Sequence, residues 1–331
     1  MRQFKFAILG AGDIAEKMAS TVIHMPRIIP YGVASRDLTR ASNLAKKYNF
    51  MKAFGSYEEM LQDPEIDLVY VATPHSHHYR HSMMCLQHGK HVLCEKSFTT
   101  NAAQAERLID FARSKNLVIA EAIWTRYLPM SKKINEIIDS GAIGNVRLLT
   151  ADLGYIVTHK KRIVDPALAG GALLDVGVYT LNFTAMVLGD KITKSSSICT
   201  FTDTGVDATG NITLCYENGV MAVLHFSVVA QTNRQGVIYG DKGCLVVENI
   251  NNPELIKVYN LDREVVATYP APKQITGFEY QVESVINAIE NGLIECPEMP
   301  HSEIIRIMKQ MDGFRKEWGL EYPAEIESVQ L

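Results

Sequence analysis

The apolar run at residues 4–10 ends in the turn GAGDIA (residues 10–15), which opens a stretch with helical spacing. The turn fits the pattern G-x-G-x-x-G/A, in which the first glycine permits a tight bend and the second lets the backbone approach a pyrophosphate. The helix N-terminus then faces the anion. We therefore expect a dinucleotide-binding unit whose cofactor contacts include Gly10, Gly12, Asp13 and Ile14. An ordinary strand-to-helix turn is the alternative.

Strand-like and helix-like stretches alternate through the first 122 residues. Apolar runs typical of buried strands occupy residues 4–10, 28–35, 67–73, 91–95 and 117–122. Amphipathic stretches of helix length, such as residues 38–49 and 102–116, lie between them. Nearly unbroken apolar strands between helices indicate a parallel sheet covered on both faces. The alternation predicts a doubly wound Rossmann domain over residues 1–122.

The pattern changes after residue 122. Helix-like stretches at 130–140 and 173–188 precede a long section with strands at hairpin spacing, and helices are expected near 277–291 and 301–318. Turns with Asn or Asp beside Gly favour antiparallel hairpins. At 331 residues the chain also exceeds the usual size of a single core. We expect an α/β protein whose second domain, residues 123–331, is α+β around a large, mainly antiparallel sheet.

Composition narrows the class of partner. The formal net charge is -4, so the chain offers no strongly basic surface for nucleic acid or anionic lipid, and small molecules are the expected ligands. No stretch approaches the ~20 apolar residues of a membrane helix, and the start does not resemble a signal peptide, so we expect a cytoplasmic protein. The six cysteines show no CxxC pairing, which favours reduced thiols.

The second apolar run ends in Ala34-Ser35-Arg36-Asp37. A site that prefers NAD would carry an acidic residue at the end of this strand, to bind the ribose 2′-hydroxyl. A hydroxyl followed by a guanidinium suits the 2′-phosphate of NADP, because arginine offers a forked set of donors. Arg40, one helical turn further on, would add to it, so we favour NADP over NAD. Alternatively, Arg36 is a solvated surface charge and Asp37 is the N-cap of the next helix.

The fifth apolar run ends in Glu95-Lys96, a pair of residue types that is seldom buried. The pair sits at the carboxyl end of a predicted parallel strand, where open α/β sheets bind their ligands. There Lys96 would reach over a nicotinamide and lower the pKa of a neighbouring hydroxyl. The alternative is a salt-bridged surface pair of little energetic value.

A third constellation lies in the stretch GGALLDVGVY (residues 170–179). Asp175 and Tyr179 are four residues apart and share a face of the expected helix. A phenol has an ordinary pKa of about 10, too high for a base near neutral pH, and a nearby ammonium would lower it. Tyr179 alone reads as a core residue, but with Lys96 it becomes a candidate acid/base.

Five motifs, in this order, resemble those of the Gfo/Idh/MocA oxidoreductases. They are GAGDIA, Thr73-Pro74 with His78, Cys94-Glu95-Lys96, Glu121-Ala122 and GGALLDVGVY. The resemblance runs over essentially the whole chain. Residues 121–129 together with Tyr179 look most similar to the branch of dihydrodiol dehydrogenases and NADP-dependent D-xylose dehydrogenases.

The resemblance implies a Rossmann domain joined to an open-faced antiparallel sheet that often mediates association into dimers or tetramers. It implies NADP(H), with Lys96 and Tyr179 beside the reacting carbon and Glu95 at the cofactor end of the site. The matching loop implies that Thr73 and Pro74 contact the cofactor and that His75 and His78 line the nicotinamide side. The substrate wall would include Trp124, Arg126 and Tyr155, with Asp175 orienting the pocket.

Two residues depart from the family pattern, and two histidines have a spacing that a metal site could use. The family usually carries proline, often after a cis peptide bond, where this chain has Ser97, and Asn182 replaces an acid found in many relatives. His77 and His81 have the spacing of a helical metal pair, but no carboxylate or thiol follows at ligand spacing, so we expect no metal.

These features predict an NADP-dependent dehydrogenase or reductase. It would act on a cyclic diol, a sugar hydroxyl or the matching carbonyl, with Tyr179 as acid/base and Lys96 assisting. The alternative is a non-catalytic protein that binds NADP(H) or a sugar to control a partner, since a fold does not determine a function.

Overall fold

The computed structural model describes residues 2–330, and the chain divides into two compact units. The first unit contains the residues up to Ile123, the segment Gln274–Met308 and the residues from Ala324 onwards. The second contains Trp124–Lys273 and Lys309–Pro323.

The first unit is built on a parallel sheet of six strands. Its strands are β1 (Phe4–Leu9), β2 (Ile28–Ala34), β3 (Lys52–Phe54), β4 (Leu68–Val71), β5 (His91–Glu95) and β6 (Ile119–Ala122). Their order is β3-β2-β1-β4-β5-β6, and every pairing is parallel. This is the doubly wound order of a Rossmann domain, so the predicted fold is confirmed. The short strand β3 was not among the expected runs.

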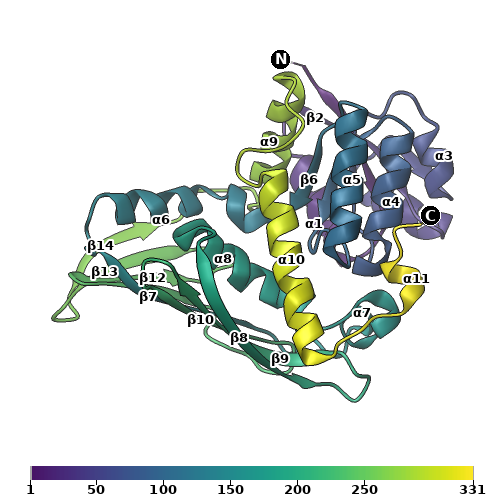
Figure 1. Cartoon of the computed structure of the whole chain (residues 1–331). Coiled ribbons are helices and arrows are strands. Elements are labelled where there is room, and N and C mark those ends of the chain that lie inside the picture. The colour runs from purple at the N-terminus through teal and green to yellow at the C-terminus, as the bar shows by residue number, and fades with distance from the viewer. Residues whose placement is uncertain (1, 331) are drawn as a thin grey trace. The chain divides into compact units, whose positions relative to one another are not determined.

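Among residues 2–330, seven helices belong wholly to this unit, and an eighth belongs to it in part. They are α1 (Asp13–Val22), α2 (Leu38–Lys47), α3 (Tyr57–Leu61), α4 (His75–Gln87), α5 (Ala102–Ser114), α9 (Glu279–Glu290) and α11 (Ala324–Glu327), while α10 (His301–Trp318) gives residues to both units. Figure 1 shows α4 and α5 side by side against the sheet. Asn101 begins α5 by accepting the amide of Gln104 at 2.9 Å, as an N-cap does.

Two late segments join the first unit, whereas the sequence-based division leaves everything after residue 122 in the second domain. Arg27 contacts Glu283 at 2.9 Å and Glu290 at 2.6 Å on α9. Nε2 of His301 lies 2.9 Å from the carbonyl oxygen of Ile119 on β6. These contacts join residues far apart in the chain, which local periodicity does not reveal.

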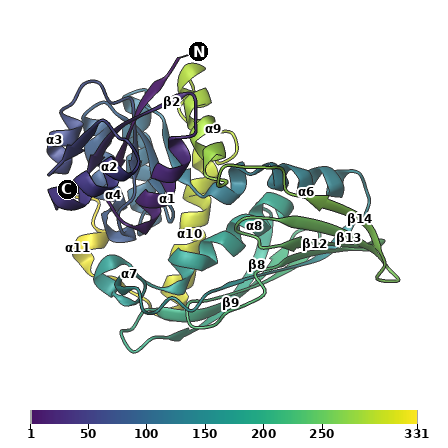
Figure 2. The same cartoon turned by 180° about the vertical axis from the view of Figure 1, so that it is seen from behind.

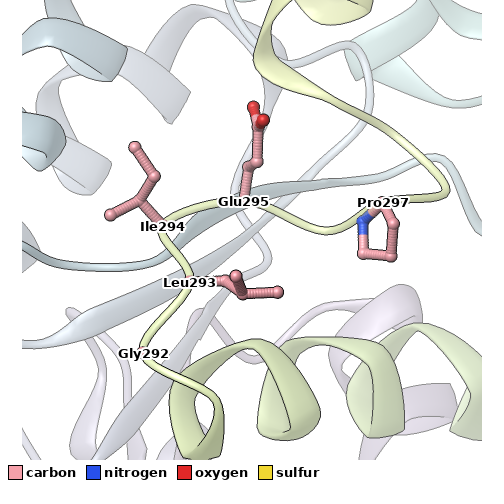
Figure 3. A pocket seen from close by; sticks show the side chains of 5 residues that line it. All are labelled: Gly292, Leu293, Ile294, Glu295 and Pro297. Atoms are coloured by element: carbon pink, nitrogen blue, oxygen red, sulfur yellow. The ribbon is translucent and has the colours of Figure 1, made fainter.

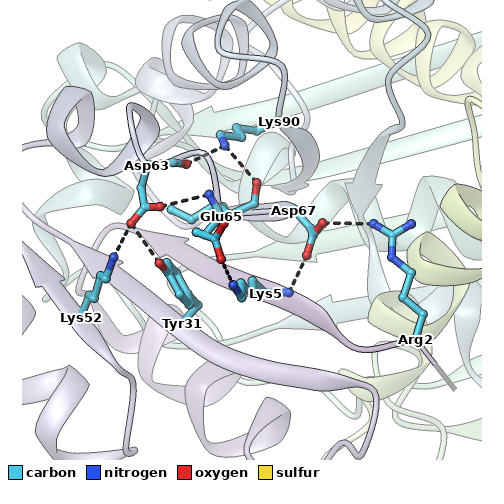
Figure 4. A network of polar contacts seen from close by, with 9 residues as sticks. Arg2, Lys5, Tyr31, Lys52, Asp63, Glu65, Asp67 and Lys90 are labelled. Carbon is cyan, nitrogen blue, oxygen red and sulfur yellow. Dashed lines mark hydrogen bonds and ion pairs between the residues drawn. The ribbon is translucent and has the colours of Figure 1, made fainter.

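A polar network lies toward the amino ends of the strands (Figure 4). Lys5 pairs with Glu65, and its backbone N–H donates to Asp67 at 2.8 Å. Lys52 contacts Asp63 at 2.7 Å. Lys5 and Lys52 lie near the starts of β1 and β3, and Asp67 directly precedes β4. The network therefore lies away from the carboxyl ends, where a cofactor would bind.

The second unit is built on a sheet of eight strands. They are β7 (Val146–Gly154), β8 (Ile192–Phe201), β9 (Asp207–Tyr216), β10 (Met221–Ser227), β11 (Gly236–Gly240), β12 (Gly243–Glu248), β13 (Leu255–Asn260) and β14 (Val265–Pro270). The order is β14-β13-β12-β11-β7-β10-β9-β8. Only the β7–β10 pair among these strands is parallel. The predicted mainly antiparallel sheet is confirmed.

Short helices complete the second unit. They are the 3₁₀ turns η1 (Trp124–Tyr127) and η2 (Pro166–Leu168), the π-helical turn η3 (Leu173–Gly177), and α6 (Pro129–Asp139), α7 (Lys161–Val164) and α8 (Val178–Leu188). Helix α8 lies against β7 and β10 on one face of the sheet (Figures 1 and 2). A Cβ on Gly177 would come within 3.1 Å of the Phe226 ring, so a larger residue there would require the ring to shift by a few tenths of an ångström.

One segment departs from the expectation that no stretch is long and apolar enough to cross a membrane. Pro166–Leu188, which contains η3 and α8, reaches that length and a mean hydropathy of 1.4. However, 78% of its apolar window is buried inside the protein. Its burial is thus that of a core helix.

Candidate active site

The glycine turn after β1 has the geometry that a pyrophosphate site requires. Gly10 has φ +114°, and a Cβ there would lie 2.7 Å from the carbonyl oxygen of Ala72, so only glycine is accommodated. A Cβ on Gly12 would meet no atom within 4 Å, which leaves open space beside the backbone. Gly12 is the N-cap of α1 and supplies no side-chain cap, so the helix amides remain available to an anion. The turn fits a dinucleotide, with Asp13 and Ile14 in the first turn of α1.

The end of β2 presents two arginines. Arg36 and Arg40 are exposed, and Nη2 of Arg40 donates to the carbonyl oxygen of Ala11 at 3.0 Å, which ties α2 to the glycine turn. The carboxylate of Asp37 accepts the amide of Thr39 at 2.9 Å and caps α2, as the alternative interpretation of this residue expects. Ser35 is buried, and its hydroxyl accepts the amide of Asp37 at 3.2 Å.

Two aromatic residues that sequence reasoning did not select lie beside these arginines. Burial raises the pKa of Tyr57, and the charges of Arg36 and Arg40 act against that rise. Burial lowers the pKa of His77, and the charge of Arg36 lowers it further. The rings of Tyr57 and His81 are 4.8 Å apart, and those of His77 and His81 are 5.4 Å apart. The carboxyl end of β2 is thus a positively charged corner with aromatic walls.

His78 joins the loops that follow β4 and β5. The side chain is fully buried, with Nδ1 2.7 Å from the carbonyl oxygen of Ser97 and Nε2 2.7 Å from that of Thr73. Burial lowers the pKa of His78 to about 4, although both carbonyl contacts favour the protonated ring. His78 therefore connects these two loops from a buried position. His75, also buried, packs edge-to-face against it at 5.7 Å, and Pro74 is the N-cap of α4.

Glu95 and Lys96 differ in their exposure. Glu95 is buried and accepts a hydrogen bond from the phenol of Tyr70 on β4, whereas Lys96 is partly exposed. The Lys96–Ser97 peptide bond is cis. The next residue, Phe98, donates its amide to the buried carboxylate of Glu121 at 3.0 Å. The phenol of Tyr70 and the carboxylate of Glu121 are thus buried groups that support this loop. In the sequence, the sign of such a role is a polar residue inside an apolar strand.

In the second unit, the turn η1 holds the face of α8 that carries Tyr179. The indole Nε1–H of Trp124 donates to the phenolic oxygen of Tyr179 at 3.1 Å. Nε of Arg126 donates to Oδ1 of Asn182, one helical turn further along, at 2.8 Å. Tyr179 is 8% exposed, and Asn182 is fully buried. Two hydrogen bonds therefore join the turn η1 to successive turns of α8.

Asp175 and Tyr155 have partners of their own in this unit. Arg162 donates to Asp175 at 2.7 Å, and the carboxylate is almost fully buried while the guanidinium is partly exposed. The phenol of Tyr155 donates to Asn251 at 3.3 Å. The hydroxyl of Thr125, next to Trp124, donates to the carbonyl oxygen of Asn251 at 3.2 Å. Asn251 therefore links Tyr155 to the turn that contacts Tyr179.

The structure groups the predicted site residues into two sets. The expected cofactor residues lie together after β1, β2, β4 and β5, four neighbouring strands of the first sheet. The expected substrate residues Trp124, Arg126, Tyr155, Asp175 and Tyr179 belong to the second unit. Lys96 is in the first unit and Tyr179 in the second.

A surface hollow lies elsewhere and contains none of these residues. It has a volume of about 320 Å³ and is lined by Gly292, Leu293, Ile294, Glu295 and Pro297 (Figure 3), which belong to the segment that connects α9 to α10. Within residues 2–330, no group of three or more His, Cys, Asp or Glu side chains is arranged to hold a metal ion.

Comparison with known proteins decides the family. Residues 4–122 match the Gfo/Idh/MocA domain described as an oxidoreductase family with an NAD-binding Rossmann fold, and residues 131–246 match the family's C-terminal domain. The chain belongs to the Gfo/Idh/MocA oxidoreductase family. The resemblance expected from the five motifs is confirmed.

Relatives within the Gfo/Idh/MocA family match nearly the whole chain. Trans-1,2-dihydrobenzene-1,2-diol dehydrogenase of Homo sapiens is 33% identical over 97% of this chain and 98% of its own length. The enzyme of the same name from Bos taurus is 34% identical with the same coverage. A 3-ketoreductase from Actinomadura kijaniata, solved with NADP and TDP-benzene, has a TM-score of 0.88 and 25% identity, covering 95% of this chain and 98% of that one.

Proposed function

We propose that the protein is an NADP-dependent oxidoreductase. It would transfer a hydride between the nicotinamide and a CH–OH or carbonyl carbon of a cyclic diol or sugar-type substrate. The substrate class rests on the relatives, which are named as a dihydrodiol dehydrogenase and a 3-ketoreductase. Tyr179 would exchange the hydroxyl proton and Lys96 would assist it.

The first unit would hold the cofactor. The amides at the start of α1 and the open space beside Gly12 suit the pyrophosphate. Arg36 and Arg40 suit the 2′-phosphate of NADP. The acidic residue that follows Arg36 is Asp37, and its carboxylate is already used to cap α2. When bound, the nicotinamide would accept or donate the hydride.

The observation that carries the proposal is the hydrogen bond from Trp124 to Tyr179. A donor at the phenolic oxygen stabilises the phenolate more than the phenol, which moves the group toward proton exchange near neutral pH. A neighbouring ammonium has the same effect on a phenol, and this is the part that we assign to Lys96. During oxidation Tyr179 would take the proton of the substrate hydroxyl, and during reduction it would return a proton to the carbonyl oxygen.

Tyr179→Phe tests this assignment. We expect turnover of NADPH with a panel of aldoses, ketoses and dicarbonyls to fall by roughly 10²–10⁴-fold, the range for loss of an acid/base group. Binding of NADPH, followed by fluorescence, should stay close to wild type. Tyr269→Phe makes the same chemical change on β14 and serves as the control. Loss of turnover and of NADPH binding together would indicate a structural role for Tyr179.

The same assay separates the enzyme from the regulatory alternative. An enzyme consumes NADPH with at least one member of the panel. Tight NADPH binding without consumption across the whole panel would favour a protein that senses NADP(H) or a sugar.

The proposal includes association through the second sheet, as a dimer or tetramer. Tyr239, Leu148 and Met221 are directly opposed on neighbouring strands and so point to one face. Tyr239 and Met221 are 39% and 42% exposed, and Val266 on β14 is 58% exposed. Exposed apolar residues on a sheet face favour its use as an interaction surface. Light scattering after size exclusion should give the wild type a molar mass of more than one protomer. Met221→Lys should shift that mass toward the monomer. A monomeric wild type would exclude association through this sheet.

A cytoplasmic location also belongs to the proposal. All six cysteines are free thiols, and Cys85, Cys94 and Cys296 are buried. Reduced thiols are the usual state in the cytosol. Fractionation of cells that produce the tagged protein would test the location, and recovery of the protein outside the cytosolic fraction would contradict it.

A further inference from the structure

Asp207, the first residue of β9, places a carboxylate inside the second unit. The residue is fully buried, and Oδ2 accepts the backbone N–H of Leu173 at 2.6 Å. Leu173 begins η3, which continues directly into α8. Asp207 therefore binds the start of the helical segment that carries Asp175 and Tyr179.

The groups that face this carboxylate are donors or positive charges. The amides of Leu173, Ala172 and Asp207 itself and the charge of Arg315 on α10 all favour the ionised form. Only the Leu173 amide reaches hydrogen-bonding geometry, and Oδ1 has no hydrogen-bond partner among residues 2–330. The other titratable groups at this position are Cys199 on β8 and Tyr322.

The carboxylate also packs directly against the turn before η3. A Cβ on Gly171, which has φ +118°, would lie 2.0 Å from Oδ1 of Asp207. The phenol of Tyr322 donates to the carbonyl oxygen of Gly170 at 2.6 Å, and the guanidinium of Arg315 lies 4.7 Å from the centre of the Tyr322 ring. Asp207 and Tyr322 therefore each contact the turn that precedes η3 and together hold it in place.

A buried carboxylate at this position is costly. Burial raises the pKa of Asp207 to about 6, so the group is charged at neutral pH at the expense of stability. An asparagine of the same size would avoid that cost. However, its amide N–H₂ would then face other donors, because the amides of Leu173, Ala172 and residue 207 all face this group. These surroundings therefore favour a side chain that only accepts hydrogen bonds.

We propose that Asp207 is a positioning residue for the reaction. Its ionised carboxylate holds the turn Gly170–Leu173, which sets where η3 and α8 begin and hence how Tyr179 presents its phenol. The proposal rests on the acid/base function proposed for Tyr179.

Asp207→Asn tests the proposal in the full-length protein, with Asp203→Asn, an exposed residue of the same unit, as the matched control. We expect kcat at neutral pH to fall about tenfold, because a neutral amide oxygen replaces the charged acceptor of the Leu173 amide, while Kd for NADPH is unchanged. The wild type should lose kcat as Asp207 becomes protonated on the acid side, and Asp207→Asn should lack this decline. A merely structural role would lower the folded fraction and leave the pH profile of kcat unchanged. Wild-type kcat with the wild-type acid decline in Asp207→Asn would overturn the proposal.

Two further measurements cover failure of Asp207→Asn to fold. Tyr322→Phe removes the second contact on the turn but keeps the carboxylate, so kcat should fall while the acid decline remains; unchanged kcat counts against the proposal. Hydrogen exchange of the wild type should show less protection of residues 172–180 at pH 5 than at pH 7.5, after correction for intrinsic rates. Equal protection would contradict the anchoring role. This exchange result does not depend on turnover, so it remains decisive if Tyr179→Phe shows that the proposed chemistry is wrong.

Discussion

Trp124 donates its indole N–H to the phenolic oxygen of Tyr179 across 3.1 Å, although 55 residues separate them in the chain. The bond orients the phenol on a helix that is buried from Val178 to Ala185. It also leaves the phenol's own proton for another acceptor, because an indole N–H only donates. Any chemistry of Tyr179 therefore depends on the turn that carries Trp124.

Trp124→Phe should weaken catalysis by Tyr179 without loss of the fold. Removing a donor from the phenolic oxygen destabilises the phenolate, so kcat should fall about tenfold and the pH at which kcat rises should move upward. Rate measurements over a range of pH would show both effects. Trp318→Phe is the matched control, since its indole donates to Ser197 at 2.9 Å instead. Equal profiles for the two variants would exclude this role for Trp124.

Arg36→Ala should change the preference between cofactors. Removing a guanidinium that binds a phosphate should raise Kd for NADPH by about 10–100-fold, whereas Kd for NADH should hardly change. Fluorescence titration with both cofactors measures the ratio. Arg113→Ala, on the exposed side of α5, is the control. Arg40 is less suitable, because it also bonds to the carbonyl oxygen of Ala11. Parallel losses for both cofactors would contradict a 2′-phosphate site at Arg36.

The two glycines of the first turn should respond differently to alanine. Gly10→Ala places a Cβ 2.7 Å from the oxygen of Ala72 at φ +114°, so it should destabilise the protein by about 1–3 kcal/mol. Gly12→Ala meets no atom and has an ordinary φ of -100°, so Tm should be unchanged while NADPH binding weakens. Thermal unfolding and NADPH titration separate the two. Normal cofactor binding in Gly12→Ala would show that no ligand approaches this backbone.

Stability should fall with acid partly through His91. Its Nδ1 accepts the amide of Val118 at 2.9 Å, and burial lowers its pKa to about 4. The unfolded state therefore binds the proton first as pH falls below about 6.5, so the contribution of His91 is present above that pH and lost below it. Urea unfolding at several pH values should show a smaller loss between pH 6.5 and 4.5 in His91→Gln than in the wild type. An identical slope would mean that the ring is not buried as a neutral base.

Local pattern in the sequence determined much of this protein. Apolar runs and helical spacing specify the Rossmann strands, because a strand buried on both faces must be apolar throughout. Gly10 specifies a turn, since only glycine tolerates φ +114° beside Ala72. Lys96 follows from the same pattern, because the end of a parallel strand is also an edge of the sheet.

Tertiary structure alone decided which polar groups meet. His78 is enclosed between the carbonyls of Thr73 and Ser97, and Asp207 binds the start of the helical segment that carries Tyr179. Segment Gln274–Met308 joins the first unit through contacts with residues that are far away in the chain. Periodicity reports which face of an element is buried, but a hydrogen bond between distant residues needs two atoms within about 3 Å in the right direction. Packing of the whole chain sets that distance, and no local pattern records it.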